Sequence, residues 1–374
     1  MRQPRTEDRV PTYHGSAGSI AAPDQRDVMS ISSDKAPLLR LDNLSKRYRP
    51  QDDPAVNEVS LELAEGEILA MLGPSGCGKT TTLRMIAGFE TPDQGDILVH
   101  GKRINDLPPR DRKIGVVFQD YALFPHLNLQ RNVMFGMQHV PRSERPGRAL
   151  EWLHLVGLDQ FVERMPDELS GGQQQRAALA RTLAAEPRLV LLDEPFSNLD
   201  AALRESTRIE VRQLLKKAGT TAILVTHDQA EALSFADRVG VMESGRLCQI
   251  GTPESVYHVP RTAFVAEFLG HTNLLPCVAQ GSQADSPLGR IDLTGSAHGE
   301  VTVSLRPEHL SLEASGQESA NCEILSREFR GHDNFYRVLG NHIEYKVLAP
   351  YDIVLEPGTP ARLTPRQPGV ILTG

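Results

Sequence analysis

The feature that most constrains this chain is a glycine-rich segment of nine residues that follows a short apolar run. The segment consists of Gly73, Pro74, Ser75, Gly76, Cys77, Gly78, Lys79, Thr80 and Thr81. It fits the P-loop pattern G-x-x-x-x-G-K-[ST]. Residues 68–72 predict a buried strand before it, and residues 79–87 predict a helix that ends at Gly88. The pattern therefore stands in the strand–loop–helix context that a P-loop requires.

This context predicts a site for a nucleoside triphosphate. Glycines let main-chain N–H groups approach phosphate oxygens without a clash from Cβ, and the helix N-terminus adds a favourable dipole for an anion. Lys79 supplies positive charge for the β- and γ-phosphates, and the Thr80 hydroxyl is a hard oxygen ligand for Mg²⁺. The alternative is a glycine-rich turn with an incidental Lys-Thr pair, which the flanking strand and helix disfavour. Cys77 is interpreted as a small residue in this tight turn.

Composition excludes several classes of protein. The net charge of −8 shows no electrostatic footprint for nucleic acid. No apolar run approaches the ~18 residues of a membrane span, so any role at a membrane has to come through partners. The four cysteines form no C-x-x-C pair, which disfavours a disulfide scaffold or a zinc site and fits a reducing cytoplasm.

The pattern of the chain predicts three regions. Residues 1–36 are polar, carry no apolar stretch typical of a secretory signal, and predict a disordered extension; Met29 is an alternative start. Over residues 37–270, strands alternate with helices, which predicts an α/β core with parallel strands. A helical stretch at about 121–183 predicts a subdomain of that core. Residues 271–374 hold short alternating apolar runs between turns, which predicts an all-β domain.

Polar residues follow several of the predicted core strands. Asp193 and Glu194 come directly after the apolar run 189–192, in the Walker B pattern. Asp193 would hold Mg²⁺ through its water shell and Glu194 would polarise the attacking water. Gln119 and His227 also end predicted strands, and ligands of open α/β sheets bind at the carboxyl ends of the strands. Taken singly, each of these residues is also compatible with an ordinary polar strand end.

A second anion-receptive helix N-terminus is predicted at Ser170, Gly171, Gly172 and Gln173. Ser170 is a good N-cap, and the two glycines permit close backbone approach. An ordinary capped helix is the alternative for these residues alone.

In combination, these motifs resemble the nucleotide-binding subunit of ABC transporters over about residues 38–250. The matched positions, in chain order, are an adenine-stacking aromatic at Tyr48, Walker A at 73–80, the Q-loop at Gln119, the signature motif at 169–173, Walker B and its catalytic glutamate at Asp193 and Glu194, the D-loop at 197–200 with Asp200, and the switch histidine at His227. The signature motif is specific to this family among P-loop proteins. The resemblance implies a P-loop NTPase fold of the ABC ATPase type.

The resemblance also implies a mechanism and partners. Two copies close head to tail around two ATP molecules, each held between Walker A of one chain and residues 170–173 of the other. Lys79, Glu194 and His227 act in catalysis, and Gln119 joins Thr80 and Asp193 around Mg²⁺. The homodimer docks on two integral-membrane permease subunits at the cytoplasmic face of the inner membrane. An extracytoplasmic solute-binding protein delivers the cargo.

Residues 121–126 would relay closure of the dimer to the permease. They carry apolar side chains that a solvated turn does not need. A loop buried within the helical subdomain is the alternative.

The C-terminal region resembles the OB-like TOBE domain of the importer branch, including residues 304–309. Residues 264–274 are most similar to polyamine and ferric-iron importers. A polyamine such as spermidine or putrescine is therefore the predicted cargo, with ferric iron or 2-aminoethylphosphonate as alternatives. A non-transport ABC ATPase would usually carry coiled-coil insertions, a second cassette or a basic surface. A regulatory module without hydrolysis is disfavoured by Glu194 and His227.

Overall fold

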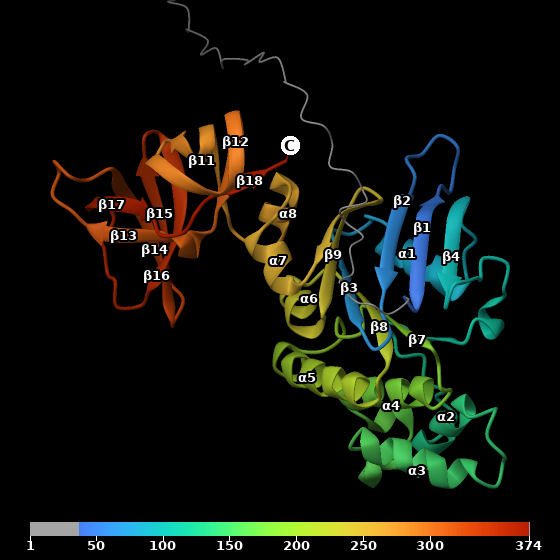
Figure 1. Ribbon diagram of the computed structural model, residues 1–374. Coiled ribbons are helices and arrows are strands. Elements are labelled where there is room, and N and C mark those ends of the chain that lie inside the picture. Colours follow the sequence, from blue (N-terminus) through green and yellow to red (C-terminus); the bar gives the residue numbers. More distant parts are fainter. Residues whose placement is uncertain (1–36, 374) are drawn as a thin grey trace, which may run out of the picture.

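The computed structural model describes residues 37–373, so the predicted extension 1–36, with Met29, lies outside the described residues. Figure 1 shows an α/β core, a group of helices beside it, and a separate all-β part formed by residues 273–372. This arrangement confirms the predicted fold class, a P-loop type α/β core followed by a small all-β domain. The helices α7 and α8 lie between the core and the all-β part.

The core is built on a six-stranded sheet with the strand order β10-β9-β3-β8-β7-β6. Its strands are β3 (Ile68–Leu72), β6 (Ile114–Val117), β7 (Leu189–Asp193), β8 (Thr221–Thr226), β9 (Arg238–Glu243) and β10 (Arg246–Gly251). All neighbours pair in parallel except β9 and β10. Strands β3 and β8 are buried at every residue, because helices and a second sheet cover both faces.

The parallel register brings strand ends together. Leu72, the last residue of β3, pairs with Thr226 at the end of β8. Asp193, at the end of β7, pairs with Val225, the residue before Thr226. The loops that follow these three strands therefore start side by side at one edge of the sheet.

A smaller antiparallel sheet packs beside the core in the order β2-β1-β4-β5. Its strands are β1 (Leu39–Lys46), β2 (Val56–Leu63), β4 (Gln94–Val99) and β5 (Lys102–Arg103). Helix α1 (Lys79–Ala87) shares one apolar cluster with this sheet and β3, in which Leu41, Met71 and Ile86 are fully buried. This packing fixes the N-terminus of α1 beside the end of β3.

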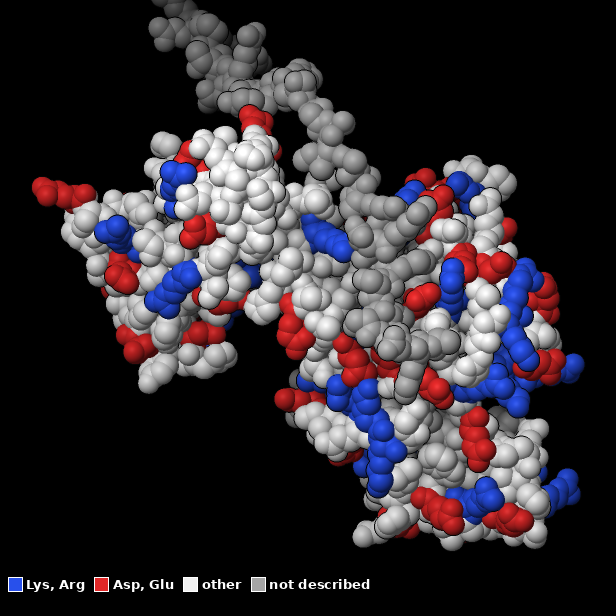
Figure 2. All heavy atoms as spheres, viewed as in Figure 1, with Lys and Arg blue, Asp and Glu red and all other residues white. Residues whose placement is uncertain are grey.

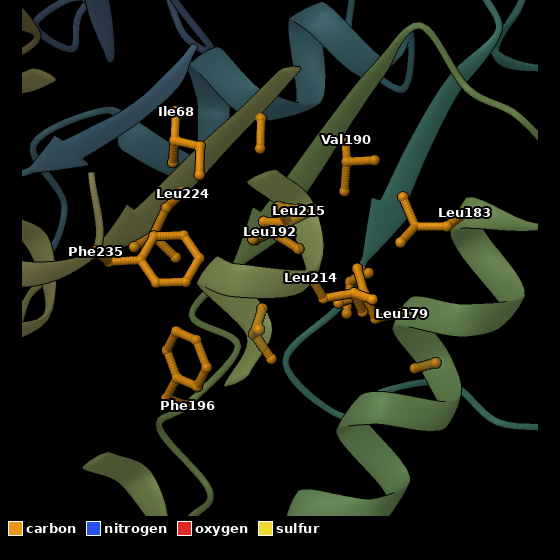
Figure 3. Close-up of a cluster of buried hydrophobic side chains, with 14 of the residues drawn as sticks. Ile68, Leu179, Leu183, Val190, Leu192, Phe196, Leu214, Leu215, Leu224 and Phe235 are labelled. Atoms are coloured by element: carbon orange, nitrogen blue, oxygen red, sulfur yellow. The ribbon is translucent and has the colours of Figure 1, made fainter. Parts of the chain in front are cut away.

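Three helices, α2 (Leu129–Gly136), α3 (Arg145–Leu155) and α4 (Gly171–Leu183), lie between β6 and β7 in the sequence. Figure 3 shows that their core is continuous with that of the sheet: Leu179 and Leu183 of α4 approach Val190 and Leu192 of β7 and Leu214 of α5 (Ala201–Lys217). Short 3₁₀ turns occur at Pro109–Asp111, Asp159–Phe161 and Pro166–Glu168.

The C-terminal part holds two antiparallel sheets, in the orders β11-β12-β18 and β13-β17-β14-β15-β16. Their strands are β11 (Asn273–Ser286), β12 (Gly289–Leu305), β13 (Leu310–Ala314), β14 (Cys322–Phe329), β15 (Asp333–Gly340), β16 (Ile343–Pro350), β17 (Pro360–Pro365) and β18 (Val370–Leu372), with a 3₁₀ turn at Pro307–His309. The two sheets enclose a separate apolar cluster that includes Val303, Tyr336 and Tyr345.

One arginine ties the all-β part to the core. Arg306 is only 2% exposed, and its guanidinium donates hydrogen bonds to the carbonyl oxygens of Tyr257 at 2.9 Å and Ala266 at 2.7 Å. Tyr257 belongs to α7 (Pro253–His258) and Ala266 to α8 (Ala263–Phe268). The guanidinium carbon also lies 4.2 Å from the Tyr257 ring centroid. The Tyr257 hydroxyl donates to Glu308 at 2.8 Å, which closes the junction.

The first prediction concerns this junction. We expect Arg306→Met to lower the free energy of unfolding by about 3 kcal/mol, because buried carbonyl groups lose their donors. Thermal unfolding would measure the loss, and limited proteolysis should show easier cleavage near residue 270. The control is Arg337→Met, since the Arg337 side chain is 58% exposed. Equal stability of the two variants would contradict the role given to Arg306.

Candidate active site

The P-loop leaves no room for side chains at two of its glycines. A Cβ atom on Gly73 would lie 2.4 Å from the Met242 carbonyl oxygen, and one on Gly78 would lie 2.2 Å from the Ala55 carbonyl oxygen. Gly78 also has φ of 102°, a conformation that other residues rarely adopt. The glycines are therefore required by close backbone packing, and this packing places the loop at the N-terminus of the nine-residue helix α1.

Lys79 lies inside the loop rather than on the surface. It is 5% exposed, and its Nζ donates to the carbonyl oxygens of Gly73 at 2.7 Å and Pro74 at 2.9 Å. The Cys77 Sγ is 3.7 Å from the same nitrogen. Cys77 is 3% exposed, and burial raises the pKa of its thiol, which keeps it protonated. An ammonium group held in this way is placed to meet phosphate oxygens cradled by the loop.

Two hard oxygen groups meet beside the loop. The Thr80 hydroxyl donates to Asp193 Oδ1 at 3.3 Å, which joins the start of α1 to the end of β7. Burial is the main cause that raises the pKa of Asp193 above its usual range. A hydroxyl and a carboxylate at this distance fit Mg²⁺, which takes one or two protein oxygens together with phosphate oxygens and water. In the described part of the chain, no group of three or more His, Cys, Asp or Glu side chains forms a metal cluster.

Glu194 and His227 are in direct contact at the ends of β7 and β8. His227 Nδ1 lies 3.2 Å from Glu194 Oε1. Glu194 has φ of 45°, and its main-chain N–H donates to Val225 at 2.9 Å. A left-handed backbone at a non-glycine residue costs roughly 1–3 kcal/mol, and such strained residues cluster at functional sites. Here it ends the strand abruptly and turns the carboxylate toward the loop that carries His227.

Gln119 follows β6 and is exposed. Its main-chain oxygen accepts a hydrogen bond from Asn198 Nδ2 at 2.8 Å, so the predicted Q-loop and D-loop are joined. Metal binding by the Gln119 side chain stays a prediction.

Residues 170–173 form the capped start of α4, as the sequence predicts. The Ser170 main-chain N–H donates to Gln173 Oε1 at 2.9 Å, and the Gln173 N–H donates to Ser170 Oγ at 3.4 Å. A Cβ atom on Gly171 would lie 2.9 Å from Leu199 Cδ2, so the segment packs on the D-loop of its own chain. Ser170 itself is exposed. This helix start is thus open to a second molecule.

The remaining predicted residues lie at the edges of this arrangement. Tyr48, in the turn after β1, is 53% exposed and its ring centroid lies 5.9 Å from Lys46 Nζ. Asp200 caps α5 by accepting from the Leu203 N–H at 3.0 Å. The structure therefore brings the P-loop, Asp193, Glu194 and His227 together, whereas stacking of adenine on Tyr48 stays a prediction.

Sequence reasoning missed several charged residues around the site. Arg181 of α4 donates to the carbonyl oxygens of Tyr121, at 3.0 Å, and Ala122, and so holds the segment after Gln119. Arg204 of α5 and Glu231 of α6 (Gln229–Phe235) lie behind the loop of His227. One signal was present in the sequence, because Arg204, Arg208 and Arg212 recur every four residues and so share one helix face.

Comparisons with known proteins place this chain in a family. The model of the ABC transporter family matches residues 56–197, and that of the TOBE domain matches residues 303–371. The Fe(3+) ions import ATP-binding protein FbpC of Mesorhizobium japonicum is 48% identical over 307 residues, which are 79% of this chain and 84% of the relative. The spermidine/putrescine import ATP-binding protein PotA of Pseudomonas fluorescens is 42% identical over 82% of this chain and 88% of the relative.

Solved structures agree with this placement. A dimeric post-hydrolysis state of the ATP-binding cassette MJ0796 bound to ADP and Pi matches with a TM-score of 0.51 and 33% identity, over 57% of this chain and 98% of that one. CbiO1 of Clostridium perfringens matches with a TM-score of 0.55 and 30% identity, over 59% of this chain and 91% of that one. No helix in the described part of the chain is long and apolar enough to cross a membrane.

The chain therefore belongs to the ABC transporter family, as an ATP-binding subunit of the importer branch that carries a C-terminal TOBE domain. The family, the fold and the ATPase class predicted from the sequence are confirmed.

A second prediction follows from the position of Lys79. We expect Lys79→Ala to weaken binding of ATP at least tenfold, because the only ammonium group within the P-loop is removed. Equilibrium titration with a fluorescent ATP analogue would measure the affinity. The control, Lys217→Ala, removes an exposed lysine at the end of α5. An unchanged affinity for ATP would count against the phosphate contact.

A third prediction uses the buried carboxyl of Glu231. Burial is the main cause that raises its pKa from 4.5 to about 7; Asp228 raises it further, while the Thr226 hydroxyl, Arg208 and His227 lower it. The neutral form is therefore favoured in the folded state, and this contribution to stability is full below about pH 4.5 and is lost as the pH rises through 7. Between pH 5.5 and pH 8, wild type should therefore lose about 2 kcal/mol of unfolding free energy that Glu231→Gln does not lose.

Denaturant unfolding of both proteins at pH 5.5 and pH 8 tests this difference. The exposed Glu205→Gln variant serves as the control and should follow wild type. Parallel pH dependence in wild type and Glu231→Gln would show that Glu231 is ionised normally in the folded protein.

Proposed function

We propose that this protein binds and hydrolyses ATP as a head-to-tail homodimer and thereby drives solute import through two membrane permease subunits. The observation that carries the proposal is the contact of 3.2 Å between Glu194 and His227, beside the Thr80–Asp193 pair and the P-loop. These groups surround one point at the carboxyl ends of parallel strands, where the γ-phosphate would lie.

Each side chain then has a distinct task. Lys79 donates to phosphate oxygens, and Glu194 accepts the proton of the attacking water. His227 keeps the Glu194 carboxylate in place and donates to the γ-phosphate. Thr80 and Asp193, with Gln119 at the Q-loop, would hold Mg²⁺, which supplies positive charge against the phosphates when bound. Tyr48 would stack on adenine, and Asp200 would place the D-loop at the dimer interface.

The exposed start of α4 supports the dimer. Ser170 is exposed, so a nucleotide held by a second molecule would have access to it. The dimeric cassette bound to ADP and Pi is a relative that assembles as a pair. We therefore assign residues 170–173 to the second wall of the partner copy's ATP site.

An exposed aromatic surface near the Q-loop supports docking on a permease. Phe89 and Phe118 are 50% and 40% exposed, with ring centroids 6.1 Å apart. Phe124 and Phe135 form a second pair at 4.4 Å. Tyr121 is buried, as the alternative of a packed loop expects, while His126 and Pro125 are exposed. Residues 121–126 thus combine an anchored start with an exposed end that a partner would contact.

A membrane permease as partner implies where the protein lies in the cell, and the surface charge bears on whether nucleic acid is a partner. We assign the protein to the cytoplasmic face of the inner membrane, where its permease and an extracytoplasmic solute-binding protein would complete the importer. The face seen in Figure 2 mixes positive and negative side chains, which does not favour nucleic acid as a partner.

We propose a polyamine, spermidine or putrescine, as the cargo, from residues 264–274 and the 42% identity with PotA. Ferric iron is the second candidate, favoured by the 48% identity with FbpC. Both cargoes are cations, so charge alone does not separate them. For 2-aminoethylphosphonate, the third candidate, neither of the two relatives described above carries the name.

The fourth prediction tests hydrolysis and dimerisation together. We expect Glu194→Gln to keep ATP binding but to lower turnover by about 10²-fold or more, because the general base is lost. Unhydrolysed ATP should then hold two copies together, so sedimentation in ATP and Mg²⁺ should show a dimer. Glu254→Gln, an exposed change on α7, should keep both wild-type turnover and monomer–dimer behaviour. Rapid hydrolysis by Glu194→Gln would remove Glu194 from its proposed role.

The same variant identifies the cargo. In cells whose own copy is replaced by Glu194→Gln, uptake of radiolabelled spermidine or putrescine should fall to background while uptake of radiolabelled ferric iron continues. The reverse pattern would assign the protein to ferric iron.

A further inference from the structure

The three residues that join β8 to α6 are held by more contacts than a turn requires. Thr226 ends β8, His227 follows it, and Asp228 is the N-cap of α6. The Thr226 hydroxyl lies 2.5 Å from Glu231 Oε2, and its oxygen accepts the Asp228 N–H at 3.0 Å. The Thr226 hydroxyl thus links Thr226 to Asp228, and His227 lies between these two residues.

A second set of contacts leads from this segment to the D-loop. Asp228 Oδ2 lies 3.7 Å from Arg204 Nη1, and Arg204 Nη2 donates to the Leu199 carbonyl oxygen at 2.9 Å. The neighbouring Asn198 donates to the Gln119 carbonyl oxygen at 2.8 Å. An uninterrupted series of polar contacts thus runs from Glu231 through the segment of His227 to the D-loop and the Q-loop.

Helix α6 does not require the Glu231 carboxyl group for its own stability. Asp228 already caps α6, because its Oδ1 accepts the Glu231 N–H at 3.0 Å. Yet the Glu231 side chain is carried into the interior: the residue is 4% exposed, and Oε1 has no hydrogen-bond partner among the described residues. Burying a carboxyl group is costly, and an apolar side chain would fill the same space. The one bond that the carboxyl makes is to the residue before His227.

We propose that Glu231 and Arg204 are positioning residues that hold the segment 226–228 from two sides and so set the place of His227 relative to Glu194 and the D-loop. The inference rests on the role proposed for His227. Neither residue touches the reacting atoms. Because the D-loop packs on residues 170–173 through Leu199, a shift of the D-loop when two copies close would be passed through Arg204 to His227.

Paired variants test the positioning role through turnover. Thr226→Val removes the hydroxyl at nearly constant volume, and Glu231→Leu removes its partner. Each should lower kcat about tenfold and leave KM for ATP within twofold, because hydrolysis geometry is disturbed and binding is not. Thr226→Ser and Glu231→Gln keep a hydrogen-bonding group and should restore kcat to within about twofold of wild type. Ser234→Ala, an exposed change on α6, is the control for the helix.

Arg204→Met should lower kcat by a similar factor, while Arg204→Lys should recover part of it. Equal kcat in wild type, Thr226→Val and Arg204→Met would overturn the proposal. An equal loss of kcat in Thr226→Ser and Thr226→Val would also overturn it, because such a loss would come from altered packing and not from the missing hydroxyl.

A double variant separates this inference from the function it rests on. If Thr226 and Glu231 act through His227, then adding Thr226→Val to His227→Ala should cause no further loss of kcat in single-turnover hydrolysis. If the two substitutions instead lower kcat by the product of their separate factors, the positioning role is overturned and the role of His227 stands. Normal turnover of His227→Ala alone would instead refute the proposed function of His227, and with it the inference.

Discussion

The parallel pairing of β3, β8 and β7 is the constraint on which the rest of the structure depends. It places Leu72, Thr226 and Asp193 at one edge of the sheet, so the P-loop, the segment of His227 and Glu194 begin side by side. A shift of one residue in either pairing would turn the side chains of a whole strand to the opposite face. The burial of β3 and β8 at every residue prevents such a shift, because each face already packs against a filled layer.

This constraint also explains which parts of the fold the sequence predicts well. A strand buried on both faces is typically a continuous apolar run, and for that reason the sequence predicts β3 at its observed bounds, 68–72. The helix of the P-loop was equally clear, because Gly78 and Gly88 mark its two ends. The family motifs then indicated the residues of the site, since each follows a core strand or begins a helix.

Contacts between distant residues were not predictable in the same way. Arg204 and Asp228 are both ordinary surface residues in a single sequence, and only the packing of α5 against α6 makes them neighbours. The bond from Asn198 to Gln119 spans 79 positions of the chain and depends on the pairing of β6 with β7. The left-handed backbone of Glu194 carries no sequence signal, because glutamate is not a residue that favours this conformation.

Two carboxyl groups near the site, Asp193, which is half-buried, and Glu231, which is buried, differ in what can compensate the cost of removing them from water. Burial raises the pKa of both Asp193 and Glu231, so in each case the protein disfavours the charged form. Asp193 lies beside the Thr80 hydroxyl at the open end of the P-loop, where a divalent cation with a bound triphosphate would restore the carboxylate and be retained by it. Glu231, by contrast, is only 4% exposed. The first carboxyl is therefore matched to a ligand, whereas the second can act only on its neighbours, and its one hydrogen-bonding neighbour through the carboxyl is the residue that precedes His227.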